Sequence, residues 1–165
     1  MRILGIDPGL AIIGYAVIDK ADNGTLSVVD YGMITTPKEH SLPVRLTEIY
    51  DAMQALLNQF KPDQIAIEEL FFNQNITTGI PVSHARGVIV LACRKFTDRL
   101  YEYTPIQIKL AITGVGRAEK HQVQYMTKTM LNLSAIPRPD DVADALAVAL
   151  CHSQTNNMLV DNLIK

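Results

Sequence analysis

The chain opens with MRILGIDPGLAIIGYAVID, residues 1–19. Its first apolar run stops at Asp7-Pro8-Gly9, which indicates a buried strand ended by a turn. Strand-forming residues then resume, and Asn23-Gly24 predicts a tight turn before they return once more. We therefore expect an antiparallel meander of three strands, at residues 2–7, 14–18 and 26–34.

Downstream of this meander the apolar spacing alternates between that of helices and that of short strands. The first helix begins after a cap at Ser41 and ends at Lys61-Pro62, where proline stops it. Further strands are expected at 64–68 and 100–103, and further helices at 75–97, 105–112, 120–131 and 140–152. Three hairpin strands followed by alternating helices and strands predict an α/β fold, a mixed five-stranded sheet flanked by helices.

The bulk composition favours one domain that buries a full core. The chain has 165 residues, of which 48% are apolar, and its net charge is −2. We expect a domain at 1–152 and a polar, mobile tail at 153–165. The pattern indicates no signal peptide and no membrane span, and it indicates two reduced thiols, Cys93 and Cys151, in a cytoplasmic protein. A net negative charge gives no global basic field, so nucleic-acid binding would need a local basic patch.

Four acidic residues stand where acids are unexpected. Asp7 and Glu68 end apolar strands, and Asp141 and Asp144 share one face at the start of an apolar helix. Sites in open α/β sheets form at strand ends, so we expect these four side chains to meet there. Clustered carboxylates need a counter-charge, and Mg²⁺ is a hard cation that prefers oxygen ligands. Two such ions are a known solution for phosphodiester hydrolysis.

Simpler interpretations exist for most of these acids taken singly. Asp7 before a Pro-Gly turn is a common turn residue. Either Glu68 or Glu69 could face the interior. In a strand buried on both faces nearly every side chain is apolar, so the sequence does not show which residues point to which face. One of Asp140 and Asp141 is expected to be the helix N-cap.

Several motifs together resemble the RuvC family of Holliday-junction resolvases. They run in the order of that family over nearly the whole chain, from residue 3 to residue 152. The motifs are GIDPG at 5–9 with GYAVI at 14–18, AIEELF at 66–71, ARG at 85–87, GVGRAEK at 114–120 and DVADALA at 141–147.

The resemblance implies an RNase H-like fold, a homodimer and cutting of four-way DNA junctions with Mg²⁺, two ions per site, for which Mn²⁺ could substitute. It selects Asp7, Glu68, Asp141 and Asp144 as metal-binding catalytic residues, and not Glu69 or Asp140. It implies that the dimer forms through the helix at 75–97. It also implies a branch-migration motor as a partner and paired symmetric nicks with 5′-phosphate ends, in recombination and repair.

The DNA contacts are expected to come from one aromatic and several basic side chains. The resemblance places Lys120 at the catalytic site and Lys109 close to the cut strand, although both would also suit a solvated helix face. An ammonium there would neutralise phosphate or charge developing in the transition state. The resemblance places Phe71 near the branch point, where it would stack on a base, although Phe71 and Phe72 could instead be core residues. Arg86 and Arg117 are further candidates for contact with the DNA backbone.

Three rival functions follow from the same residues. A junction-binding module without cleavage keeps the fold, but four acids argue against it. An actin-like ATPase shares the Asp7-x-Gly9 turn, but the chain has no second glycine-rich lobe. A YqgF-type RNase H-like nuclease would act on RNA, and the segment at 68–71 favours the resolvase instead.

Overall fold

The computed structural model describes residues 1–70, 76–155 and 162–164, with side chains left out at 76–78. A mixed five-stranded sheet of order β3-β2-β1-β4-β5 forms its centre. The first three strands pair antiparallel, and β1, β4 and β5 run parallel, as the sequence predicted. The strands are β1 Arg2–Asp7, β2 Ile12–Lys20, β3 Leu26–Thr35, β4 Gln64–Glu68 and β5 Leu100–Tyr103.

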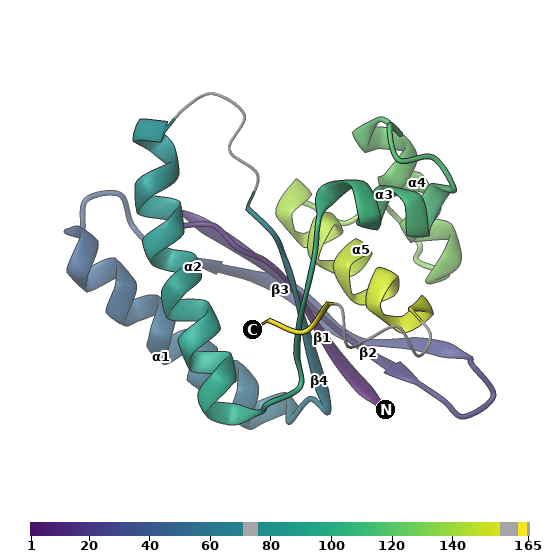
Figure 1. Cartoon of the computed structure of the whole chain (residues 1–165), viewed down its shortest axis with the longest axis horizontal. Coiled ribbons are helices and arrows are strands. Elements are labelled where there is room, and N and C mark those ends of the chain that lie inside the picture. The colour runs from purple at the N-terminus through teal and green to yellow at the C-terminus, as the bar shows by residue number, and fades with distance from the viewer. Residues whose placement is uncertain (71–75, 156–161, 165) are drawn as a thin grey trace.

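Helices cover both faces of this sheet (Figure 1). One side carries α1 (Leu42–Phe60) and α2 (Ile76–Phe96), and the other carries α3 (Pro105–Thr113), α4 (Lys120–Met130) and α5 (Asp140–Gln154). Thr104 caps α3 in a reciprocal capping box with Gln107, as expected for a Thr-Pro start. The prediction that an aspartate is the N-cap of α5 is wrong, because Pro139 occupies that position. Asp140 and Asp141 lie in the first helical turn, where their negative charges interact favourably with the helix dipole.

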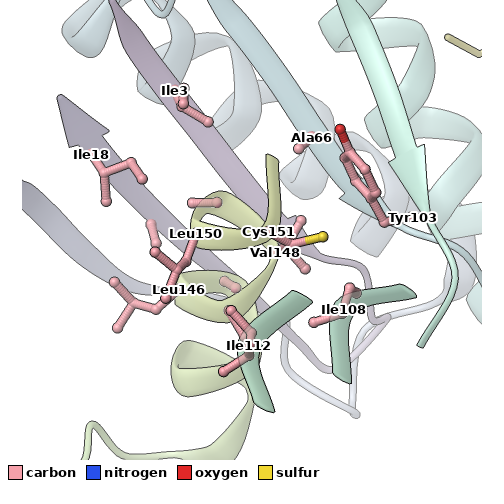
Figure 2. Close-up of a cluster of buried hydrophobic side chains, with 14 of the residues drawn as sticks. Ile3, Ile18, Ala66, Tyr103, Ile108, Ile112, Leu146, Val148, Leu150 and Cys151 are labelled. Carbon is pink, nitrogen blue, oxygen red and sulfur yellow. The ribbon is translucent and has the colours of Figure 1, made fainter. Parts of the chain in front are cut away.

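Two hydrophobic cores lie on opposite faces of the sheet. Successive β1 side chains alternate between them, because strand side chains have a period of two. Ile3 packs with α5 in the core that Figure 2 shows, whereas Leu4 and Ile6 pack with α1 and α2. Central strands buried on both faces explain the near-continuous apolar runs in the sequence.

Glycines at two sheet positions let α5 lie directly on the strands. A Cβ built on Gly5 would be 2.4 Å from the carbonyl oxygen of Ala145, and one on Gly14 would be 1.9 Å from that of Asp141. Both distances are far below van der Waals contact, so no side chain fits at either position. The start of α5 therefore rests on the middle of the sheet.

Two residues near the C-terminus, Leu163 and Ile164, pair with the outer edge of β5. Leu163 forms an antiparallel bridge with Tyr101, and the Ile164 N–H donates to the Leu100 carbonyl at 3.0 Å. This part of the expected tail is packed, and it covers a sheet edge that would otherwise expose unpaired backbone groups. Both cysteines are buried and unpaired, as expected. Within the described ranges, no helix has the length and apolar character to cross a bilayer.

Candidate active site

The parallel pairing of β1 with β4 brings the first two acids together. Ile6 pairs with Ile67, so Asp7 and Glu68 follow side by side at the carboxyl ends of the two strands. Strand alternation also resolves the choice between the adjacent glutamates. Ala66 packs in the core beneath α5, so Glu68, two residues on, points to the same side.

Helix α5 brings the other two acids to this edge. Gly14 pairs with Asp7 across the β1–β2 ladder, and the Asp141 backbone lies against Gly14. Asp144 follows one turn later on the same helix face. Acids from three distant parts of the chain therefore converge at one edge of the sheet.

The convergence of these acids shifts their pKa values. Burial, together with the nearby charges of Glu68, Asp144 and Asp141, raises the pKa of Asp7 to about 8, although the charge of Lys120 opposes this shift. Burial and then the charge of Asp144 raise the pKa of Glu68 to about 7. Burial is also the largest cause of the raised pKa of Asp144. Without a counter-ion, this group of acids retains protons near neutral pH.

The side chain of Lys120 forms ion pairs with two acids at this site. Its ammonium lies 2.8 Å from Asp144 Oδ2 and 3.3 Å from Asp140 Oδ2. Lys120, Lys109, Glu68 and Asp144 line a pocket of about 180 Å³. The floor of the pocket is apolar, formed by Pro105, Ile108, Val123 and Ala147. The pocket combines negative groups at the strand ends with two ammonium groups that suit a phosphate.

The donor set fits Mg²⁺ in chemistry. Among the described residues, no three His, Cys, Asp or Glu side chains form a ready-made cation cage. Mg²⁺ does not need one, because it keeps several waters and binds through one or two carboxylates plus substrate phosphates. Burial and mutual repulsion raise the pKa values of Asp7, Glu68 and Asp144, and a bound cation would relieve that repulsion. Asp141 adds a fourth carboxyl group to the set of oxygen ligands.

The other expected DNA contacts are dispersed. Arg117 is exposed in the loop between α3 and α4, on the side of the sheet that carries the site. Arg86 lies on α2, where its guanidinium pairs with Glu102 at 2.6 Å, so a DNA contact would compete with that ion pair. Phe71 lies outside the described residues. The DNA-contact roles of these three residues stay predictions.

Sequence reasoning missed the supports of Lys120. From the sequence, Asp140 was a candidate helix N-cap with no link to Lys120, and Gln124 was not considered. In the structure, Gln124 Nε2 donates to Asp140 Oδ1 at 3.1 Å. Lys120 and Gln124 are four residues apart and so lie on one face of α4, and Asp140 and Asp144 share a face of α5 in the same way. That spacing was visible in the sequence, but nothing local shows that the two helix faces meet.

The raised pKa values predict how pH affects the metal-free protein. Unfolding returns Asp7 and Glu68 to ordinary carboxyl pKa values, so between pH 6.5 and 8.5 only the folded state loses their protons. Stability should therefore fall as pH rises through about 7 to 8. Thermal unfolding followed by circular dichroism should show a lower midpoint at pH 8.5 than at pH 6.5.

Magnesium should reverse this loss. A ligand that binds only the folded state stabilises it by about 2.7 kcal/mol at 100 times its dissociation constant. Since protons compete for the same carboxylates, the midpoint should rise more at pH 8.5 than at pH 6.5. Asp7→Asn should flatten both responses. Equal midpoints at the two pH values in the unsubstituted protein would contradict the clustered acids.

Fold and site together define an RNase H-like nuclease: a mixed sheet with acids at the ends of its two central parallel strands and on the helix across them. Comparisons with known proteins narrow this class. Residues 3–152 match the family model described as crossover junction endodeoxyribonuclease RuvC. The protein of that name from Alkaliphilus oremlandii is 53% identical over 157 residues, 95% of each chain.

Solved structures agree with this match. The Thermus thermophilus RuvC structure superimposes with a TM-score of 0.84 and 32% identity, covering 93% of both chains. The structure of T. thermophilus RuvC in complex with Holliday junction substrate gives a TM-score of 0.83 at 29% identity over the same share. The chain belongs to the RuvC family of crossover junction endodeoxyribonucleases. This membership favours DNA hydrolysis over the RNA-directed and non-cleaving alternatives.

Proposed function

We propose that the chain resolves Holliday junctions by Mg²⁺-dependent hydrolysis, with Asp7, Glu68, Asp141 and Asp144 holding the ions. The observation that carries this proposal is the meeting of β1, β4 and the start of α5 at one edge of the sheet, which brings their acids together. Bound there, Mg²⁺ supplies Lewis acidity to the scissile phosphate and a lower pKa for the attacking water. The proposal includes two ions per site, for which Mn²⁺ could substitute, and this part of it rests on the family resemblance.

The protein residues contribute positioning and charge. The carboxylates would hold the ions at the strand ends beside the pocket, and the ions would in turn set where a phosphate binds. Lys120 and Lys109 flank this position, so their ammonium groups can neutralise charge that develops on the phosphate oxygens. In-line attack by water then releases 5′-phosphate and 3′-hydroxyl ends.

We also propose that two copies act together as a homodimer through α2. The exposed residues Ile80, His84, Gly87 and Leu91 follow i, i+4, i+7 and i+11 spacing and form one face of this helix. Two large apolar side chains on that face, Ile80 and Leu91, are about half exposed, at 52% and 55%. A two-fold dimer would place one site on each of two like strands of a junction. Sedimentation of the protein, with Leu91→Glu as the disrupting variant, measures this association.

The cellular setting that we propose rests on the family likeness. The enzyme would act in the cytoplasm during recombination and DNA repair. Its substrate would be a four-way junction, presented by a branch-migration motor.

The direct test is cleavage of a synthetic four-way junction with 5′-labelled strands. With Mg²⁺ we expect paired nicks at symmetric positions in two opposing strands, and with a chelator no nicks. A linear duplex of the same sequence and a structured RNA serve as matched substrates. Equal cutting of the linear duplex, or faster cutting of the RNA, would contradict the proposal.

A further inference from the structure

The ammonium of Lys120 is shared between two carboxylates of different kinds. One is Asp144, which the proposed function makes a metal ligand, and the other is Asp140, one helical turn earlier on α5. A carboxylate that ligates a cation has less negative charge left for an ammonium. When Mg²⁺ occupies the site, Lys120 therefore needs a second anion to stay beside it.

Asp140 is held in a position where it can be this second anion. The Gln124 amide donates to Asp140 Oδ1, while Oδ2 faces Lys120. Gln124 is itself buried, with 6% of its surface exposed, so its amide has a fixed position. Arg138 also pairs with Oδ1, but its side chain is 70% exposed. An aspartate carboxyl is ordinarily ionised at neutral pH, so Asp140 places a negative charge beside the Lys120 ammonium.

We propose that Asp140, anchored by Gln124, is a positioning residue that retains the Lys120 ammonium at the catalytic pocket. This inference rests on the proposed function. It assigns the first acid of α5 a role distinct from its neighbours: Asp141 and Asp144 hold ions, and Asp140 orients the cation that acts with them. Asp140 itself touches neither the phosphate nor the ions.

The first test uses the protein in saturating Mg²⁺, because in that state the proposed function has Asp144 engaged by an ion and Asp140 left as the partner of Lys120. Lys120 and Lys109 are labelled with a low concentration of acetic anhydride, and the extent of labelling is read by mass spectrometry. Asp140→Asn keeps an acceptor for Gln124 but removes the charge, so labelling of Lys120 should rise severalfold while that of Lys109 stays the same. Arg138→Ala is the matched control, and it should leave Lys120 protected. Unchanged labelling of Lys120 in Asp140→Asn would overturn the proposal.

The second test separates this role from general destabilisation. Asp140→Asn should lower kcat for junction cleavage by about fivefold with little change in KM, the size expected for loss of one partly exposed ion pair. In a Lys120→Ala background the same substitution should have no further effect, because Asp140 acts through Lys120. Asp140→Glu should restore part of the rate.

The outcomes distinguish this inference from the proposed function. If Lys120→Ala cuts at the normal rate, the catalytic role of Lys120 in the proposed function fails. If Lys120→Ala is impaired and Asp140→Asn is not, only the positioning role fails. Equal losses from Asp140→Asn with and without Lys120 would likewise overturn the positioning role.

Discussion

Asp7→Asn should abolish junction cleavage while leaving junction binding nearly intact. Asp7 lies at the centre of the acid cluster, since the charges of Glu68, Asp144 and Asp141 all act on it. The amide keeps the shape of the side chain but removes a negative charge and a good oxygen ligand. We expect the single-turnover rate to fall by about a thousandfold or more, as for other groups at the centre of a catalytic unit.

Binding should survive because phosphate contacts, and not Asp7, provide most of the affinity for DNA. A mobility-shift assay without Mg²⁺ should give a dissociation constant close to that of the unsubstituted protein. Replacing a buried carboxyl with a raised pKa by a neutral isostere should also stabilise the metal-free fold at pH 8.5.

Asp51→Asn is the matched control for this substitution. Asp51 is exposed on α1, on the face of the sheet opposite the site, and the control variant should cut at the normal rate. If Asp7→Asn cuts within a few-fold of the unsubstituted protein, the assignment of the active site is wrong. If it loses binding as well, the separation of binding from chemistry is wrong.

Gly14→Ala should lower both the stability of the fold and the rate of junction cleavage. Replacing glycine by alanine in a strand normally stabilises by about 0.5–1 kcal/mol. Here the new Cβ would lie 1.9 Å from the Asp141 carbonyl oxygen and 2.5 Å from its carbonyl carbon. These are backbone atoms, so the start of α5 must move away from the sheet.

Overpacking of this kind costs about 1–3 kcal/mol, and urea unfolding should show the loss. Moving α5 also moves Asp141 and Asp144 away from Asp7 and Glu68. A displacement of about 1 Å can lower an enzymatic rate about a hundredfold, so cleavage should fall by a similar factor even where the variant is folded.

Gly116→Ala provides the control for stability. Its new Cβ would lie 3.2 Å from Ile106 Cγ2 and 3.9 Å from the Ile106 carbonyl oxygen, so a small shift of the Ile106 side chain accommodates it. We expect its unfolding free energy to stay within about 1 kcal/mol of the original. A Gly14→Ala variant as stable and as active as the unsubstituted protein would show that α5 does not depend on this close approach.

Much of the fold was predictable because its signals are local. Turn residues divided the first 35 residues into three strands, and apolar spacing separated helices from strands along the rest of the described chain. Thr104 before proline identified the start of α3. The unusual positions of Asp7 and Asp144 within apolar segments identified acids that needed a shared counter-charge.

The tertiary structure decided which side chains meet. In a strand buried on both faces, the sequence cannot show whether Glu68 or its neighbour faces α5, and the packing of Ala66 settles it. Likewise, the pairing of Asp140 with Lys120 depends on the contact between α4 and α5. The spacing of apolar residues along the chain shows which face of a helix or strand is buried. Which other element packs against that face depends on how the helices and strands are arranged in space.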